Sequence, residues 1–158
     1  MNRRELVSFL RENFALDWRG IHGAPHWARV RVNGLHLAKL NKANTRVVEA
    51  FALVHDSCRL NDGHDPEHGL RAGQLARRVN NRLLLLQKDE LDQLVHACEG
   101  HSEGHVDADV TVQTCWDADR LDLGRVGIRP SPNRLCTAAA RDPIVIAWAF
   151  ARSVANEA

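Results

Sequence analysis

The sequence predicts an all-α fold, a compact bundle of about six or seven helices in a single domain that covers residues 1–158. Apolar residues recur at helical spacing in several segments, and no stretch shows convincing strand alternation or a hairpin turn. The runs TVQT and RLLLL could pass for short strands, but both stand beside helical patterns. With 158 residues, 44% of them hydrophobic and 26% charged, the chain has the size and composition of one globular domain.

The predicted helices follow one another with polar or glycine-containing breaks between them. The first, over residues 2–13, places its leucines and phenylalanines on one face. Pro25 suits the first turn of a second helix, and Asn44 is a plausible N-cap for a third helix that runs to His55. A loop rich in Asn, Asp, Gly and Pro then precedes a helix that starts at His68. Further helices are predicted over residues 88–99, within 107–124 and from residue 143 onward.

Composition and charge narrow the classes of partner and the compartment. The net charge of +1 predicts no strong attraction to a long nucleic-acid track or to a membrane surface. No apolar run approaches the roughly 18 residues of a membrane-spanning helix, and no signal-peptide core follows the first basic residues. The four cysteines stand far apart without a CxxC pair, which is typical of reduced thiols in a cytoplasmic protein. The nine histidines are the unusual feature, and they point toward a metal site.

The stretch FALVHDSCRLND, residues 51–62, is the centre of the predicted site. An apolar helix runs there directly into His55 and Asp56. An imidazole and a carboxylate at the end of a buried helix need a partner, because burying an unpaired polar group or charge is costly. A divalent cation would be such a partner, whereas exposure at the surface is the simpler alternative. His26 and Asp119 could converge on the pair from elsewhere in the chain, and this favours the cation.

Three short motifs carry a resemblance to a known family. HWARV at His26, ALVHD ending in His55 and Asp56, and DADRLD at Asp119 resemble, in order and in local detail, the HD-domain superfamily of metal-dependent phosphohydrolases. The resemblance covers about residues 20–127, and its longer pattern is similar to a small single-domain bacterial subgroup. It implies an HD-domain helical bundle, a metal site and Asp56 in the catalytic role. The implied metal ligands are His26, His55, Asp56 and Asp119.

The implied ligand set also indicates the cofactor. Two imidazoles and two carboxylates suit Mn, Co, Ni, Fe or Zn. We expect one ion, with two ions as the alternative, since the resemblance places His68 and His101 where two-metal members of the superfamily carry extra ligands. Otherwise His68 packs at a helix start and His101 lies in a loop between glycines, and either could serve as a proton relay. Asp117 should turn away from Asp119 on a helix. We assign five histidines to structure or surface: His22, His36, His64, His96 and His105.

Arginines near the ligands are candidates for binding substrate phosphate. Arg59 follows the His-Asp pair by three residues, Arg29 shares a helix face with the first histidine ligand, and Arg120 adjoins the last aspartate ligand. Each could instead pair with an aspartate in a structural role. The candidates for such pairing are Asp62, Asp117 and Asp122.

The leading functional prediction is hydrolysis of a small phosphorylated molecule, with a nucleotide favoured. A non-catalytic metal- or nucleotide-binding module is one alternative. A di-iron oxygenase of the HD type, which cleaves a C–C or C–P bond, is the other, and it requires both His68 and His101 as ligands.

Overall fold

The computed structural model describes residues 1–156, which contain seven α-helices and no strand. The predicted all-α class of about six or seven helices is therefore confirmed. The two strand-like runs lie in α6 and at a π-helical turn. Across the described residues, no helix combines the length and the apolar composition needed to cross a bilayer. The helices are α1 (Arg3–Asn13), α2 (Ala24–Asn41), α3 (Thr45–Val54), α4 (His68–Val79), α5 (Lys88–Gly100), α6 (Val110–Arg120) and α7 (Pro143–Ala155), with a π-helical turn at Asn80–Leu84 and 3-10 turns at Leu123–Val126 and Pro132–Arg134.

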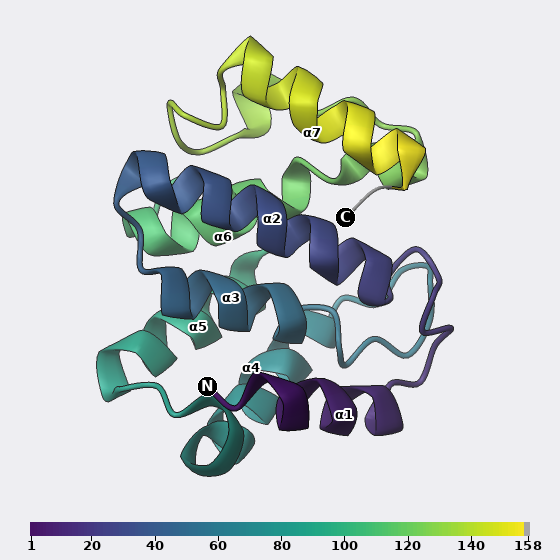
Figure 1. The fold of residues 1–158 in the computed structure, drawn as a ribbon, viewed down its shortest axis with the longest axis vertical. Helices are drawn as coiled ribbons and strands as arrows, with labels where there is room; N and C mark the ends of the chain where they lie inside the picture. The colour runs from purple at the N-terminus through teal and green to yellow at the C-terminus, as the bar shows by residue number, and fades with distance from the viewer. Residues whose placement is uncertain (157–158) are drawn as a thin grey trace.

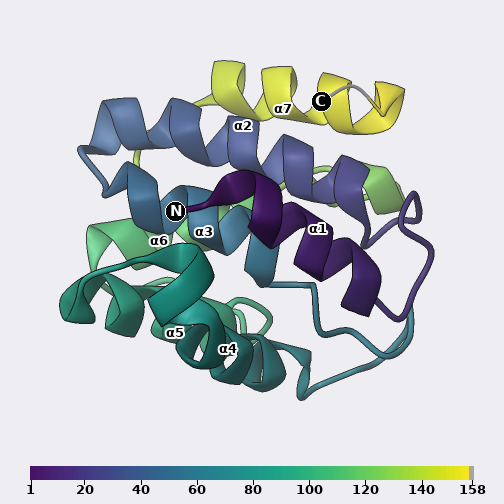
Figure 2. The same ribbon diagram turned by 60° about the horizontal axis from the view of Figure 1, so that its bottom comes forward.

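The helices stack in layers around α3 (Figure 1). α2 packs on α3 and on α6, α3 also contacts α5, and α4 packs along α5. α7 lies along the outer side of α2, and α1 lies at the opposite end of the bundle. Figure 2 brings α1 forward, near the 80–84 turn, where the Asn2 N–H donates to the Leu83 carbonyl at 2.8 Å. This arrangement brings the C-terminal ends of α3 and α5 and the N-terminal end of α4 toward α2 and α6.

α3 carries the centre of the hydrophobic core. Asn44 caps the helix as predicted, because its side-chain oxygen accepts from the Arg46 N–H at 3.0 Å. Every residue from Ala50 to Val54 is buried. Phe51 has no exposed surface, and burying a side chain of this size contributes about 1.5–3 kcal/mol. α3 ends at Val54 inside the protein, and the polar residues that follow, His55 and Asp56, are therefore buried as well.

Two glycines allow close approach of helices where these polar residues lie. A Cβ added at Gly34 in α2 would lie 2.5 Å from Val48 Cγ1 in α3. A Cβ added at Gly69, beside His68 at the start of α4, would overlap the carbonyl oxygen of Cys98 in α5. Only glycine leaves room for such an approach, since any other residue places a carbon atom there. The two positions hold α2 against α3 and α4 against α5.

Candidate metal centre

Side chains from five helices or their ends meet at one point in the interior. α2, the end of α3, the start of α4, the end of α5 and α6 each contribute at least one of them. Nearly all are buried, and the most exposed side chain retains only 16% of its surface, on Asp119. The structure brings together the four ligands that the resemblance implies and the two additional histidines. These residues are His26, His55, Asp56, His68, His101 and Asp119.

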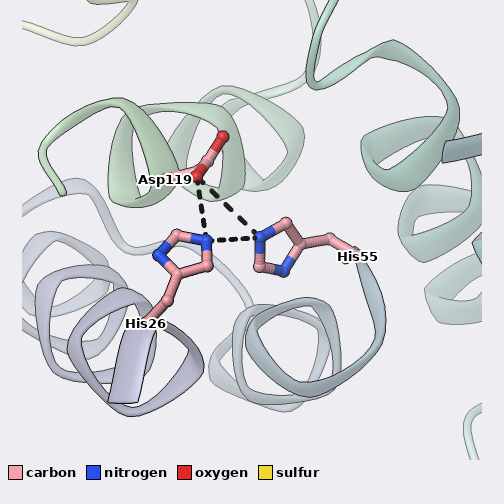
Figure 3. A group of neighbouring side chains, drawn as sticks. All are labelled: His26, His55 and Asp119. Atoms are coloured by element: carbon pink, nitrogen blue, oxygen red, sulfur yellow. Dashed lines mark hydrogen bonds and ion pairs between the residues drawn. The ribbon is translucent and has the colours of Figure 1, made fainter. Parts of the chain in front are cut away.

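The first group in this cluster consists of His26, His55 and Asp119 (Figure 3). The Nε2 atoms of the two imidazoles are 3.1 Å apart, and Asp119 Oδ1 lies 3.4 Å from His26 Nε2 and 3.8 Å from His55 Nε2. Asp56 Oδ2 approaches the same two nitrogens at 3.6 and 3.9 Å. Two ligand atoms bound to one zinc-like ion at about 2.0–2.2 Å lie roughly 3.0–3.5 Å apart. The two shortest spacings, 3.1 and 3.4 Å, lie in this range, and the other three exceed it by 0.1–0.4 Å, so a shared cation would need only a small inward shift of the carboxylates.

Hydrogen bonds on the far side of each ring fix which nitrogen carries the proton. His26 Nδ1 lies 2.7 Å from Asp122 Oδ2, and His55 Nδ1 lies 3.1 Å from the Phe51 carbonyl oxygen. Because a carboxylate or carbonyl oxygen accepts, each Nδ1 donates its proton. In the neutral rings both Nε2 atoms then present lone pairs, and these face each other. A cation between them removes the repulsion, and metal-binding histidines are typically oriented in this way.

A second group forms at the other oxygen of Asp56. Asp56 Oδ1 is 3.3 Å from His68 Nε2 and 3.5 Å from His101 Nε2, and these two nitrogens are 2.8 Å apart. His68 Nδ1 donates to a backbone carbonyl, and His101 Nδ1 donates to the Cys98 carbonyl at 2.7 Å, so lone pairs face each other again. Ligand atoms of His55, Asp56 and His101 lie within 4.8 Å of one another. The buried cluster could thus hold a metal ion, with Asp56 between two groups of imidazoles.

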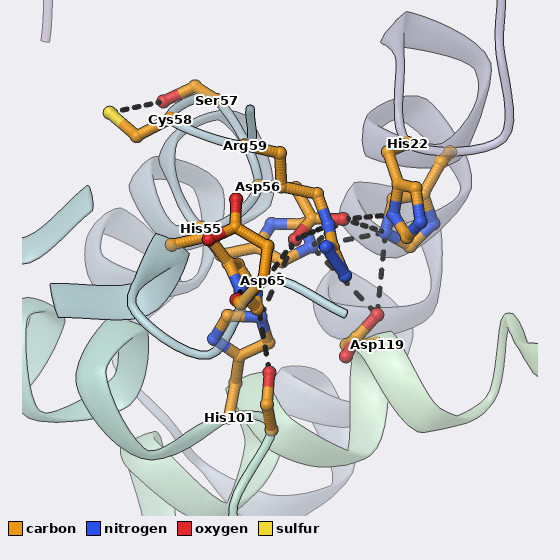
Figure 4. Close-up of polar contacts among 12 residues, drawn as sticks. His22, His55, Asp56, Ser57, Cys58, Arg59, Asp65, His101 and Asp119 are labelled. Atoms are coloured by element: carbon orange, nitrogen blue, oxygen red, sulfur yellow. Dashed lines mark hydrogen bonds and ion pairs between the residues drawn. The ribbon is translucent and has the colours of Figure 1, made fainter. Parts of the chain in front are cut away.

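His22, which the sequence led us to assign to structure or surface, belongs to the site. Its Nδ1 lies 2.8 Å from Asp56 Oδ2 (Figure 4). The turn before α2 is held by Trp27, whose Nε1 donates to the His22 carbonyl at 2.8 Å. The only sequence signal was the pair of histidines in HGAPH, which a turn and a proline separate. The other four histidines of that assignment lie outside the cluster: His36, His64, His96 and His105.

Arg59 is the predicted phosphate-binding residue that reaches the cluster. Its Nε lies 3.3 Å from Asp56 Oδ1, and Figure 4 shows the side chain extending over Asp56 toward the histidines. Its Nε and Nη1 are buried, and neither has a hydrogen-bond partner within residues 1–156. Leaving a buried donor of a charged group without an acceptor is costly. An anion bound at the cluster would supply the acceptor.

The other two predicted phosphate-binding arginines have different partners. Arg29 donates from Nε and Nη2 to Asp122 at 2.6 and 3.1 Å and is buried. Arg29 therefore has the structural pairing that was the alternative to phosphate binding. Asp122 packs against the face of α2 that carries both Arg29 and His26. Arg120 donates to the carbonyl oxygens of Arg134 and His105 at 3.0 and 2.6 Å. Helical rotation turns Arg120 away from the neighbouring aspartate ligand and toward an adjacent cavity.

The end of α6 supplies two further contacts that sequence reasoning did not single out. Asp122 orients one imidazole ligand, as described above, and Arg125 Nη1 lies 3.9 Å from Asp119 Oδ1. Asp117 faces away, as helical geometry predicts, and its Oδ1 accepts from the Cys136 N–H at 2.6 Å. Asp117 thus fixes the segment that follows α6, whereas Asp122 supports the site by orienting His26.

Electrostatic surroundings favour the metal-binding forms of His55, Asp56 and Asp119. Burial lowers the pKa of His55 to about 3, so this ring is neutral at neutral pH. Burial opposes ionisation of Asp56, but the imidazoles around it hold the pKa of Asp56 well below its usual range. For Asp119, burial is outweighed by two histidines and Arg125, and its pKa is also lowered. At His101 burial is outweighed by the neighbouring Asp56 carboxylate, which raises the pKa of this ring and favours its protonated form when no cation is bound.

A cavity of about 700 Å³ opens onto the cluster at His101 and Asp119. Its other walls come from the loop after α5 and from residues 123–135. Cavities of about 300–1,000 Å³ are typical of small-molecule sites. A second cavity, of about 350 Å³, lies between α1, α4 and the turn at residues 57–60. The larger cavity has His101 and Asp119 on its wall, whereas the smaller one has Arg59 but none of the six clustered histidines and aspartates, so the larger cavity is the more direct route to the cluster.

Comparisons with protein-family models, with curated proteins and with solved structures find no significant match to this chain. The site is therefore characterised by its own residues. It offers imidazole nitrogens with fixed tautomers, two ionised carboxylates and a cationic side chain with unsatisfied donors. This donor set is typical of a centre for a divalent transition metal that handles an anionic ligand.

Proposed function

We propose that this protein is a metal-dependent phosphohydrolase that acts on a small phosphorylated molecule, with a nucleotide as the leading candidate. The observation that carries the proposal is the pairing of Nε2 lone pairs on both sides of Asp56, in a buried cluster that a cavity reaches. The motifs HWARV, ALVHD and DADRLD, which resemble those of HD-domain phosphohydrolases, contribute the first group of ligands. Geometry and resemblance thus support the same class of reaction.

We infer that the cluster takes two divalent ions drawn from Mn, Co, Ni, Fe and Zn. The sequence alone favoured one ion, because His101 was expected in a loop between glycines. In the structure α5 extends to Gly100, and the hydrogen bond to the Cys98 carbonyl holds the His101 ring beside Asp56. The two groups on opposite oxygens of Asp56 therefore support two ions. When bound, such ions polarise a phosphoryl group and help to ionise a water molecule.

The side chains around the cluster have roles that follow from their contacts. Arg59 would donate to a phosphoryl oxygen, because its buried Nε and Nη1 have no other acceptor. His22 holds the Asp56 carboxylate in place by donating from Nδ1 to Oδ2. Arg125 places positive charge beside Asp119, with Nη1 3.9 Å from Oδ1. The leaving group would occupy the larger cavity, since it is the open space next to His101 and Asp119.

A di-iron oxygenase that cleaves a C–C or C–P bond is the second candidate. It requires the second group of ligands, and His68 and His101 are both positioned beside Asp56. The hydrolase is the stronger proposal because Arg59 offers unsatisfied donors for an anion directly over the cluster.

Metal analysis of the protein as isolated, followed by phosphate-release assays, tests the proposal. The assays use a panel of nucleotides and sugar phosphates with Mn, Co, Ni, Fe, Zn and Mg. We expect metal-dependent release of phosphate that His55→Gln abolishes and that His64→Gln, a change at an exposed histidine, leaves intact. Oxygen consumption without phosphate release would favour the oxygenase. Bound metal with neither reaction would indicate a metal-binding module. Absence of bound metal under all loading conditions would refute the hydrolase and the oxygenase and leave only a nucleotide-binding module.

A further inference from the structure

The larger cavity has an excess of positive charge that the metal cluster does not use. Three arginines line it beyond the ligands: Arg120, Arg129 and Arg134. Among residues 1–156, the only carboxylate on its walls is that of Asp119, which faces the histidines. Several basic side chains around one cavity raise the local concentration of anions and favour their binding.

The partners of these arginines leave their charges unneutralised. Arg120 donates to backbone carbonyls, and the Arg129 guanidinium lies over the Phe150 ring at 5.0 Å from its centroid. The Arg134 side chain has no hydrogen-bond or ion-pair partner in the described chain, residues 1–156. No carboxylate among those residues lies within ion-pair distance of any of the three. Arg134 is exposed, so its donors are available to a ligand in the cavity.

The remaining lining of the cavity is largely aliphatic. Val106, Leu123 and Ile128 contribute to it, and no Phe, Tyr or Trp side chain of the described residues does. Base recognition commonly relies on stacking against aromatic rings. The chemistry of the walls therefore suits a carbon chain or sugar that ends in an anionic group better than it suits a stacked base, and among small phosphorylated molecules it favours one other than the nucleotide that the resemblance suggested.

We propose that the substrate carries a second anionic group, a phosphate or carboxylate, which the arginines of this cavity bind while the scissile phosphate lies at the cluster. This inference rests on the proposed hydrolase, because it places the scissile phosphate beside His101 and Asp119. Arg134 and Arg129 are the residues that select for the second group. Guanidinium groups suit both anions, since they donate two parallel hydrogen bonds to carboxylate or phosphate.

Equilibrium binding of phosphonates, whose C–P bond resists hydrolysis, separates this proposal from catalysis. The probes are an alkylphosphonate, the matching ω-phosphonocarboxylate and the matching α,ω-bisphosphonate, each with chains of two to six carbons, titrated into manganese-loaded protein. We expect at least one probe with a second anionic group to bind about tenfold tighter than the matching alkylphosphonate. This is the change in affinity that corresponds to one charge-assisted hydrogen bond. The carboxylate and bisphosphonate arms show which anion is preferred.

Variants with the same change in net charge test whether the cavity arginines are responsible. Arg129→Gln/Arg134→Gln should remove the preference for probes with a second anionic group and leave binding of the alkylphosphonate unchanged. Arg4→Gln/Arg82→Gln, at two exposed arginines in α1 and in the 80–84 turn, should retain the preference. Equal affinity for all probes in the wild type, or a preference that survives in the double variant, would overturn the inference. Loss of phosphate release from every substrate with an intact, arginine-dependent preference would instead remove the hydrolase and leave the anion site.

Discussion

Replacing His68 and His101 together with alanine should remove one metal ion and leave the other. On the Oδ1 side of Asp56 these two imidazoles supply the nitrogens at 3.3 and 3.5 Å. Without them that side retains only the Asp56 carboxylate, because the single Nε2 lone pair of His55 faces His26, and one residue is too few for a four-coordinate site. The Oδ2 side keeps His26, His55, Asp56 and Asp119. Metal content should therefore fall from about two ions per chain to about one.

The assay is elemental analysis after loading with excess manganese or cobalt and removal of free ions by gel filtration. The matched control replaces His96 and His105, two exposed histidines that pack against Trp116 outside the cluster, and it should keep full metal content. If the variant lacking His68 and His101 binds as much metal as the wild type, the second site does not exist. The oxygenase candidate would fall with it, because that chemistry needs both ions.

Three further outcomes follow from the geometry. Gly69→Ala should lower the free energy of unfolding by about 1–3 kcal/mol in urea titrations, because the new methyl group overlaps the Cys98 carbonyl and forces α4 from α5; unchanged stability would show that the contact is not tight. Metal-free protein should lose stability as the pH falls from about 6.5 toward about 3, because unfolding raises the His55 pKa from about 3 to its ordinary value and the unfolded chain then binds the proton; a His55→Gln variant with an equally steep urea-midpoint profile would contradict this. Asp119→Asn should reduce metal content in elemental analysis, whereas Asp117→Asn should chiefly lower stability; the reverse would show that the ligand was assigned to the wrong aspartate.

Local patterns were sufficient for much of the fold, and the resemblance singled out His26, His55, Asp56 and Asp119, which the structure brings together. The cap at Asn44 and the start of α4 at His68 depend on neighbours in sequence, which a single sequence displays. The predicted helix within residues 107–124 is shorter than that range, since α6 ends at Arg120 and a 3-10 turn follows.

Sequence reasoning could not decide between long-range partners. Helical spacing correctly placed Arg29 near His26 and left Asp122 among three candidate partners, but it could not choose among them because Asp122 lies 93 residues away along the chain. His22 was missed for the same reason, since its contact with Asp56 spans 34 residues and depends on the turn before α2. A pattern reports which face a side chain occupies, whereas the group that meets that face is decided by tertiary packing.

The hydrogen bonds that orient the four imidazole rings of the cluster are of two kinds, some within one segment of the chain and one between distant segments. Three rings donate to carbonyls three or four residues earlier in their own segment: His55 to Phe51, His68 to Asp65 and His101 to Cys98. Once their helices form, these ligands are preoriented. His26 instead depends on Asp122, which Arg29 links to Asn156 at the end of α7. Strain at the end of α7 would therefore reach the cluster through the His26 ring alone, since the orienting hydrogen bonds of the other three rings do not involve α7.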